Sequence, residues 1–400
     1  MAAMDRVGTI RDKAAAYRDH TAANLSRMIT VPSLSGQEGD LVEILTPMIE
    51  EAGFDEVRLD GFGNILARVG TGKRILAIDG HIDTVDTGDL SRWEHDPFSG
   101  TIADGHVFGR GSVDQEGGVA SMITAGRILK ELGYDGRFTV HFTFTIYEED
   151  ADGVCWNYLI EEEGLRPDFA VITEPTNLGV YRGHRGRMEM DVAFTGLSAH
   201  GSAPERGDNA IYKAARAITA VEQLNERLKP DPFLGKGSLV VSHVESEAPS
   251  LCAVADKASF HVDRRLTWGE TRESAIAEIR EAAGPEATIT VPVYDAPSYR
   301  GTVFPQEAYF PTWKIDADHP LVQAGAETYR RLFAEEPNVD KWTFSTNGVA
   351  ICGKHEIPTI GFGPGNEVYA HAPNEKTPIA HLEAASAFYA LLPYVLEEQP

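Results

Sequence analysis

Apolar positions in the first 180 residues recur with two periods, one typical of helices and one typical of strands. Gly118–Leu132 carries apolar side chains at helical spacing and ends before Gly133. Phe138–Ile146 alternates strictly between apolar and polar side chains, which predicts a strand. The short apolar runs 74–78 and 169–173 predict two buried strands. This alternation favours an α/β layer architecture with a largely parallel central sheet.

The ends of the chain add helices, and a different pattern begins near residue 183. The first 55 residues predict two helices joined by the turn-rich segment 32–36. After residue 183 a small two-layer α+β unit is expected, with strands at 187–194, 238–244, 258–262 and 287–293 and helices at 209–228 and 273–283. The α/β pattern then resumes and closes with a long helix, for which Thr377 suits the N-cap and Pro378 the first helical position. We therefore expect one discontinuous domain, residues 1–183 and 298–400, with a smaller domain, residues 184–297, inserted into it.

Composition and charge narrow the class of partner. The chain has 36 Lys+Arg against 61 Asp+Glu, a formal net charge of −25, and no basic cluster. This argues against nucleic acids and anionic membranes, which bind clustered cations. No apolar run approaches the ~20 residues of a membrane span. The N-terminal amphipathic helix contains acids, unlike a signal peptide, and the three scattered cysteines argue against a disulfide framework, so we expect a cytoplasmic protein.

Candidate metal ligands follow several of the predicted strands. His81 and Asp83 lie two residues apart on an extended segment, which places them on one side. The glycine-rich loop before a predicted helix carries Asp114, and the strand 138–146 leads into the pair Glu148–Glu149, whose members strand periodicity sends to opposite sides. Glu174 directly follows the strand 169–173. Each signal alone is weak, but ligands of open α/β sheets bind beyond the carboxyl ends of strands, where these residues lie.

In this order, the segments resemble the M20 family of co-catalytic zinc amidohydrolases, which includes acetylornithine deacetylase, succinyl-diaminopimelate desuccinylase and aminoacylase. The resemblance covers nearly the whole chain. It is carried by Gly80-His81-Ile82-Asp83, Gly109-Arg110-Gly111 with Asp114 and Gly117-Gly118, Glu148-Glu149, Glu174-Pro175-Thr176, Arg185-Gly186, Gly196-Leu197-Ser198-Ala199-His200 with Asn209-Ala210-Ile211, and Tyr369-Ala370-His371-Ala372-Pro373-Asn374-Glu375. It implies a zinc-peptidase-like catalytic domain with a mostly parallel sheet, and an inserted ferredoxin-like lid and dimerisation domain.

The resemblance also implies the roles of the site residues and two Zn²⁺ ions per subunit, with Co²⁺ or Mn²⁺ as possible substitutes. Asp114 resembles the carboxylate that bridges the two metals. The further implied ligands are His81 and Glu174 for one metal and Glu149 and His371 for the other. Asp83 is expected to support His81, and Glu148 to be the general base that activates the metal-bound water.

The resemblance extends to the inserted domain and the substrate. His200 is expected to reach the active site of the partner in a homodimer and to stabilise the developing oxyanion. Arg265 resembles an arginine that binds a substrate carboxylate, although a structural salt bridge is an equal alternative. Arg185 and the loop residue Asn347 are further candidates for substrate binding.

The expected function is hydrolysis of an amide bond in an N-acyl amino acid or short peptide. A dipeptidase or carboxypeptidase, a carbamoyl-amino-acid hydrolase and an inactive metal-binding scaffold remain open alternatives. Where many relatives have a lysine before the two glycines, this chain has Glu116, which is expected to add negative charge near the metals. Ser250 lies where a substrate-contacting asparagine is expected. The segments Gln115–Gly118 and Tyr309–Trp313 resemble a branch of selenium-metabolism-linked hydrolases.

Overall fold

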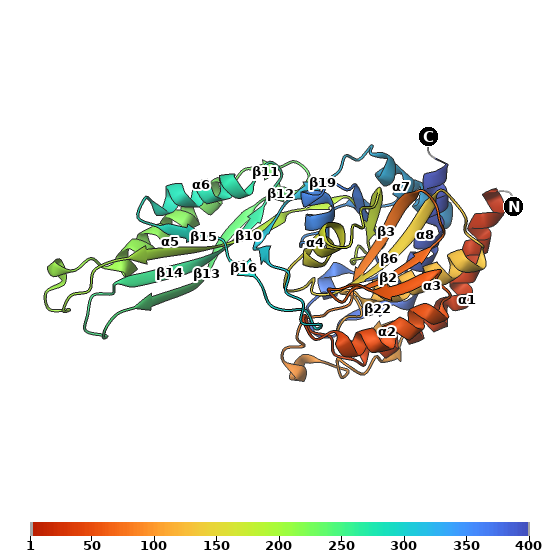
Figure 1. Ribbon diagram of the computed structural model, residues 1–400, viewed down its shortest axis with the longest axis horizontal. Coiled ribbons are helices and arrows are strands. Elements are labelled where there is room, and N and C mark those ends of the chain that lie inside the picture. Colours follow the sequence, from red (N-terminus) through yellow and green to blue (C-terminus); the bar gives the residue numbers. More distant parts are fainter. Residues whose placement is uncertain (1–2, 399–400) are drawn as a thin grey trace.

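A computed structural model describes residues 3–398 and shows two lobes arranged along one long axis (Figure 1). The large lobe contains both ends of the chain and an eight-stranded sheet in the order β1-β2-β6-β3-β7-β21-β8-β20. Its strands are β1 (Glu56–Leu59), β2 (Ile65–Val69), β3 (Arg74–His81), β6 (Phe138–Thr145), β7 (Phe169–Ile172), β8 (Val180–Tyr181), β20 (Val339–Asp340) and β21 (Thr359–Gly361). Its helices are α1 (Ala3–Ile29), α2 (Gly39–Glu51), α3 (Glu116–Glu131), α4 (Val154–Glu161), α7 (Pro320–Phe333) and α8 (Ile379–Glu397).

The centre of this sheet is parallel. β6, β3, β7 and β21 run in the same direction, whereas β1 and β2 pair antiparallel at one edge. α1, α3, α7 and α8 pack against one another along the sheet, and one continuous apolar core joins these helices to the strands. The predicted mixed α/β architecture with a mostly parallel central sheet is confirmed.

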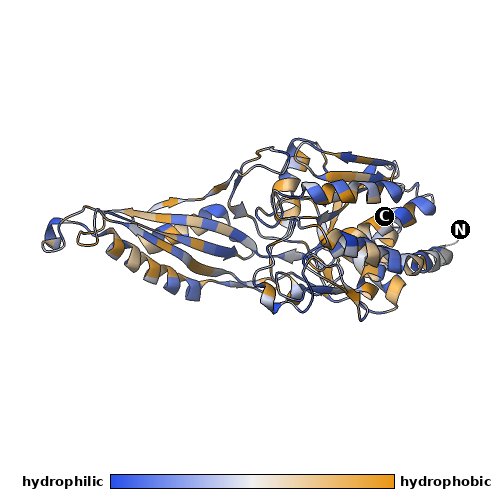
Figure 2. Ribbon diagram, turned by 90° about the horizontal axis from the view of Figure 1, so that it is seen from below, coloured by the Kyte–Doolittle hydropathy of each residue, from blue (hydrophilic) through white to orange (hydrophobic). Residues whose placement is uncertain are grey.

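The small lobe is a second sheet with its own core. Its strands and helices follow the order β10 (Gly186–Thr195), α5 (Ala210–Arg227), β13 (Ser238–Glu247), β14 (Lys257–Leu266), α6 (Arg272–Ala283) and β15 (Thr288–Thr290). The sheet order is β13-β14-β10-β15, and all pairs are antiparallel. This β-α-β-β-α-β order is the ferredoxin-like topology. Buried and partly exposed residues alternate along β10 and β14, and the helices cover one face of the sheet only (Figure 2).

The remaining strands are short and lie in both lobes and in the segments that connect them. They are β4 (Ile102–Ala103), β5 (His106–Phe108), β9 (Gly183–His184), β11 (Pro230–Asp231), β12 (Gly235–Lys236), β16 (Val293–Tyr294), β17 (Gln306–Glu307), β18 (Tyr309–Phe310), β19 (Trp313–Lys314) and β22 (Lys376–Pro378). β18 pairs with β10 of the small lobe, although it lies beyond residue 297. The domain boundaries at 183 and 297 stay a prediction.

The start of the last helix differs from the prediction. Pro378 occupies the N-cap of α8, and no side chain caps this end. Thr377 lies in β22, and its hydroxyl donates to the carbonyl of Ser112 at 2.6 Å, because the chain is still extended there. Among the described residues, α8 alone has the length and hydropathy of a membrane span, but 78% of that window is buried inside the protein.

Candidate metal centre

The six side chains expected in a metal centre meet at one edge of the central sheet. β6, β3 and β7 are neighbours and run parallel, so their carboxyl ends share this edge. His81 ends β3, the pair Glu148–Glu149 follows β6, and Glu174 follows β7. Asp114 precedes α3, and His371 follows the short 3-10 helix η4 (Glu367–Tyr369).

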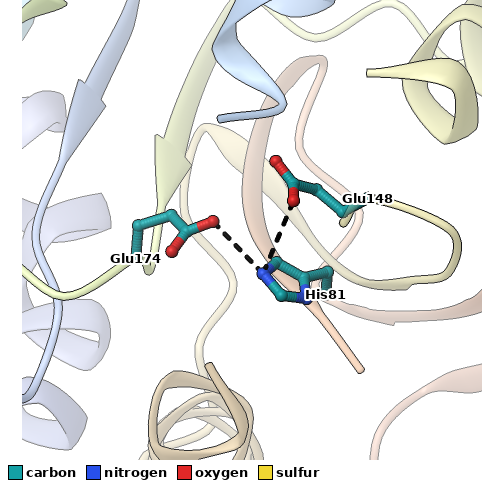
Figure 3. A group of neighbouring side chains, drawn as sticks. All are labelled: His81, Glu148 and Glu174. Carbon is teal, nitrogen blue, oxygen red and sulfur yellow. Dashed lines mark ion pairs between the residues drawn. The ribbon is translucent and has the colours of Figure 1, made fainter. Parts of the chain in front are cut away.

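One group of ligand atoms surrounds Nε2 of His81. This nitrogen lies 3.3 Å from Oε1 of Glu174 and 3.8 Å from Oε2 of Glu148 (Figure 3). It also lies 3.2 Å from Oδ1 of Asp114. All four side chains are buried, and the donor atoms of the three residues drawn lie within 4.8 Å of one another.

The second group shares Asp114 with the first. Nε2 of His371 lies 3.3 Å from Oδ2 of Asp114 and 2.9 Å from Oε2 of Glu149. The two carboxylate oxygens of Asp114 therefore face different histidines, Oδ1 towards His81 and Oδ2 towards His371. His371 is 52% exposed, whereas His81 is fully buried, so the second group is the one that opens to solvent.

Asp83 supports both the imidazole and the glutamates. Nδ1 of His81 lies 2.9 Å from the carbonyl oxygen of Asp83 and 3.5 Å from its carboxylate. A proton on Nδ1 is held there, which leaves Nε2 free for a metal. The Asp83 carboxylate also accepts from the backbone N–H of Glu148 at 3.1 Å, the backbone N–H of Glu149 at 3.0 Å and the hydroxyl of Ser35 at 2.7 Å.

A buried ion pair joins the loop of His371 to the loop of Asp114. Oε2 of Glu375 accepts from Nη1 of Arg110 at 2.6 Å, and the two side chains are 0% and 3% exposed. Oε1 of Glu375 accepts from the backbone N–H groups of Val113 at 2.7 Å and Asp114 at 3.0 Å. This fully bonded carboxylate fixes the backbone on which the shared ligand is mounted.

Crowding and burial shift the titration of the ligands. Burial raises the pKa of Glu149 to about 7 and the pKa of Glu174 to about 8, and it raises the pKa of Glu148 well above its usual value. Hydrogen bonds to two carboxylates raise the pKa of His371 to about 10. For Asp114, burial opposes ionisation, but hydrogen bonds from the two histidines hold its pKa below the usual range. A divalent cation would compete with protons for these ligands.

The donor set fits a divalent metal. Oε1 of Glu148 and Oε2 of Glu174 are buried and have no hydrogen-bond partner within residues 3–398. A buried acceptor without a donor is unfavourable, and a cation at the centre of the group removes that cost. Imidazole nitrogens with carboxylate oxygens are ligands for Zn²⁺, and Co²⁺ and Mn²⁺ accept similar sets.

The sequence pattern attributed the different directions of Glu148 and Glu149 to strand alternation. In the structure they come from a turn. β6 ends before both residues, and Tyr147 adopts a left-handed backbone conformation with φ 66°. Such a φ is uncommon for a residue other than glycine. The turn places Glu148 near His81 and Glu149 near His371.

Glu116 is the first residue of α3 and is 1% exposed. Burial together with the nearby Glu375 raises its pKa well above the usual value. The expected addition of negative charge near the ligands stays a prediction. Packing explains the glycine at position 118, because a Cβ there would lie 2.4 Å from Oγ1 of Thr173 at the end of β7.

A cleft of about 320 Å³ opens over the ligands. It is lined by Asp114, Glu148, Glu149, Asp152, Glu174, Arg187, Arg265, Phe344, Ser345, Glu367, Ala370 and His371. Arg265 therefore lines the cleft over the ligands, and it also forms the alternative salt bridge, with both bonds to Asp263 at 3.0 Å.

Two other substrate-binding candidates lie outside this lining. The guanidinium of Arg185 donates to the carbonyls of Lys236 and Thr343 instead. Asn347 is 1% exposed. Its amide donates to Asp79 at 2.9 Å and to Thr145 at 3.2 Å, and its oxygen accepts from two groups of the 153–155 turn. Asn347 thus has no free polar group for a substrate, and its contacts support the floor of the site.

His200 lies apart from the cleft of its own chain. It belongs to the loop 196–209 between β10 and α5, at the end of the small lobe that points away from the large lobe (Figure 1). Nδ1 of His200 accepts from the hydroxyl of Ser202 at 2.7 Å, and His200 bridges to Ala253 of the loop that carries Ser250.

Several residues of the site were missed at the level of sequence. Arg110 and Glu375 lie inside the segments that carried the resemblance, so their position in those segments was an available signal. Ser35, Asp152 and Arg187 gave no such signal, because only the folded chain brings them to Asp83 and to the cleft.

Comparison with known proteins decides the family. Residues 77–394 match the family described as Peptidase family M20/M25/M40. The chain belongs to this family. It is 50% identical over 387 residues to the protein YgeY of Escherichia coli K12, with 96% of each chain covered. It is 28% identical to a succinyl-diaminopimelate desuccinylase of Magnetococcus marinus, over 91% of this chain and 95% of the relative. This M20 protein is thus a metallo-hydrolase that acts on C–N bonds.

The fold agrees with solved M20 structures. An M20 family metallo-carboxypeptidase, Sso-CP2 of Sulfolobus solfataricus, superposes with a TM-score of 0.74 at 17% identity, covering 95% of this chain and 99% of that chain. At this identity the likeness shows the fold alone.

Proposed function

We propose that this protein hydrolyses an amide bond in N-acyl amino acids or small peptide-like substrates, with two divalent metal ions at the described centre. The observation that carries the proposal is the position of Glu148. Its carboxylate lies beside the first ligand group, lines the cleft and leaves Oε1 without a hydrogen-bond partner within residues 3–398.

His81, Asp114 and Glu174 would hold one metal, and Asp114, Glu149 and His371 the other. Two metals of this kind, when bound, acidify a water molecule and polarise the carbonyl that it attacks. We take Zn²⁺ as the physiological ion, with Co²⁺ or Mn²⁺ as substitutes.

Glu148 is the general base of the proposed reaction. It receives a proton from the attacking water and passes this proton to the nitrogen of the departing amine. Asp83 holds the base in place through the backbone N–H of Glu148 at 3.1 Å.

The small lobe has the proposed role of a lid and dimerisation domain. His200 is not among the residues that line the cleft of its own chain, so its proposed contact with the oxyanion is made in the partner of a homodimer. Closure of the lid over the substrate would exclude water from the cleft. We place this activity in the cytoplasm.

An N-acyl amino acid is the proposed substrate because the relative named as a desuccinylase covers 91% of this chain. Dipeptides and N-carbamoyl amino acids contain the same type of scissile C–N bond. They are therefore separate arms of the test and not further proposals.

The test is amine release from N-acetyl, N-succinyl and N-carbamoyl amino acids and from dipeptides, with zinc- or cobalt-loaded protein. Glu148→Gln is expected to retain both metals and to lower kcat by about 10²–10⁴-fold. Metal content by atomic absorption separates loss of the base from loss of the ions. Turnover that Glu148→Gln leaves unchanged would remove Glu148 from the mechanism, and turnover of dipeptides alone would replace the acyl substrate by a peptide.

A further inference from the structure

Two arginines of the cleft are direct neighbours across two strands. Arg187 of β10 pairs with Arg265 of β14 in the antiparallel register. Opposed residues of such a pair project on the same side of the sheet, with Cβ atoms about 5 Å apart. Both side chains line the cleft over the metal ligands. They are the only arginine or lysine side chains among the described lining residues.

The two guanidinium groups are held differently. Arg265 makes a planar double contact with Asp263, with both distances at 3.0 Å. Arg187 reaches Asp152 at 3.3 Å and Glu189 at 3.5 Å, and its Nε is buried with no hydrogen-bond partner within residues 3–398. Charge-assisted hydrogen bonds are normally about 2.7–2.9 Å long. The partners of Arg187 therefore leave part of its hydrogen-bonding capacity unused.

The residues around Arg187 hold its guanidinium in one orientation and favour its charged form. Its guanidinium lies over the ring of Phe310, 4.4 Å from the centroid. This contact orients a flexible side chain and favours the cation. Asp152 shares its carboxylate between Arg187 and the hydroxyl of Ser345, which also lines the cleft.

We propose that Arg187 binds a carboxylate of the substrate beside the one that Arg265 takes, so that the preferred amide substrates carry two carboxylates. The rest of the lining contains six acidic side chains, which repel a carboxylate wherever the metals do not neutralise them. Among the described lining residues, only Arg187 and Arg265 offer a planar guanidinium that can donate two hydrogen bonds to one carboxylate. The inference rests on the proposed amide hydrolysis and adds the class of substrate to it.

The competing explanation is a purely structural role. Arg187 belongs to the small lobe and Asp152 to the turn after β6, so their contact also joins the two lobes. A joint of this kind affects every substrate equally. A carboxylate-binding residue affects only substrates that carry the second carboxylate.

Matched probes separate these roles. N-acetyl-L-glutamate and N-acetyl-L-glutamine differ only in a side-chain carboxylate, and N-succinyl-L-norvaline and N-succinamoyl-L-norvaline differ only in an acyl carboxylate. Binding is measured by calorimetry to metal-loaded Glu148→Gln protein, and kcat/KM is measured with the active enzyme. In one of the pairs, the dicarboxylate is expected to bind about 10- to 100-fold more tightly than its amide.

Four variants complete the experiment. Arg187→Gln is expected to abolish the preference by weakening the dicarboxylate alone, and Arg187→Lys, which keeps the charge but not the planar fork, to retain part of it. Arg272→Gln, in α6 of the same lobe and outside the cleft, is expected to leave the preference unchanged. Asp152→Asn keeps the Arg187 guanidinium and is expected to keep the preference, whereas a structural role predicts that Asp152→Asn and Arg187→Gln weaken the binding of both members of each pair equally.

The outcomes distinguish this inference from the proposed function. Binding that shows the Arg187-dependent preference without turnover of any probe would support the arginine site and overturn the proposed hydrolysis. Equal binding of both members of each pair, no binding of any probe, or equal weakening of both members by Arg187→Gln would overturn the arginine site, whatever the turnover.

Discussion

The two sheets of the molecule present their charged residues in opposite ways. In the central sheet, the charged side chains lie beyond the carboxyl ends of β3, β6 and β7, and they are buried, as His81 and Asp83 at 0% exposure show. In the sheet of the small lobe, they lie along the open face at alternate positions. There Asp191 and His261 form a pair 2.8 Å apart, at 49% and 25% exposure.

Strand direction accounts for this difference. Parallel strands bring their carboxyl ends to one edge, where residues that are distant in sequence converge. An antiparallel sheet covered on one face leaves a second face to water, and its polar residues spread along that face. The same residue types therefore form a metal centre in one lobe and a solvated surface in the other, apart from the end of the small sheet that reaches the cleft.

The same substitution in the two lobes is expected to have very different effects. Asp114→Asn removes the carboxylate whose two oxygens face both histidines, so both metals of the proposed centre would lose a ligand. Metal affinity should fall by more than the roughly 10–100-fold typical of a supporting residue, and activity should fall with it. Asp191→Asn, in the small lobe, should leave metal content unchanged in the same atomic absorption measurement. Full metal occupancy in Asp114→Asn would contradict the bridging role.

The loop 196–209 of the small lobe, which carries His200, is expected to affect catalysis, unlike the solvated face of the same lobe. His200→Ala should lower kcat by about 10²–10³-fold, the effect of losing one oxyanion donor, while both metals remain bound. Co-expression with Glu148→Gln should restore part of the activity, because hybrid dimers contain one site with both an intact base and the partner's histidine. Absence of restoration in purified hybrid dimers would place the action of His200 within its own chain or remove it from catalysis.

The sequence predicted what local patterns and strand ends determine. The helices and strands around β3, α3, β6 and β7 were expected close to where they lie, because their apolar periods are regular. The ligand types at the strand ends were visible for the same reason, although their roles remain proposals. The turn at Tyr147 was not visible, since a positive φ at a tyrosine has no sequence signature.

Contacts between distant segments could not be predicted. The cross-strand pairing of Arg187 with Arg265 depends on the register of two strands, β10 and β14, between which the chain forms α5 and the strands β11, β12 and β13. Asn347 was assigned to the substrate because it lies in a distinctive loop, but the fold buries that loop against Asp79. Side-chain roles that rest on register or on burial need the folded chain.

A buried histidine at the junction of the lobes makes the free energy of unfolding depend on pH. Nε2 of His184 accepts from Nε1–H of Trp313 at 2.7 Å and from the N–H of Thr346 at 3.1 Å, and Nδ1 donates to a carbonyl at 2.8 Å. Burial lowers the pKa of His184 to about 4, from 6.5. The unfolded chain thus binds a proton that the folded chain excludes between these values, so stability falls as pH decreases from 6.5 towards 4.

The expected contribution is on the order of 3 kcal/mol, fully present above pH 6.5 and lost near pH 4. Urea unfolding of the wild type and of His184→Gln at pH 7.5, 5.5 and 4.5 measures it. The variant should be less stable at pH 7.5, where two donors lose their acceptor, and its stability should fall less steeply below pH 6.5. Parallel slopes for His184→Gln and the wild type would show that His184 does not titrate in this range.

The smallest effect is expected on the surface of the small lobe, even where the ion-pair geometry is good. Arg272 of α6 contacts Glu307 through two hydrogen bonds of 2.8 and 2.6 Å, but the side chains are 34% and 43% exposed. Solvent screens such a pair, so Arg272→Ala should lower the free energy of unfolding by about 1 kcal/mol or less. Phe260→Ala, in the core of the same lobe, should cost about 3–5 kcal/mol in the same urea titration. A loss at Arg272 as large as that at Phe260 would mean that the exposed pair, and not the apolar core, holds α6 on the sheet.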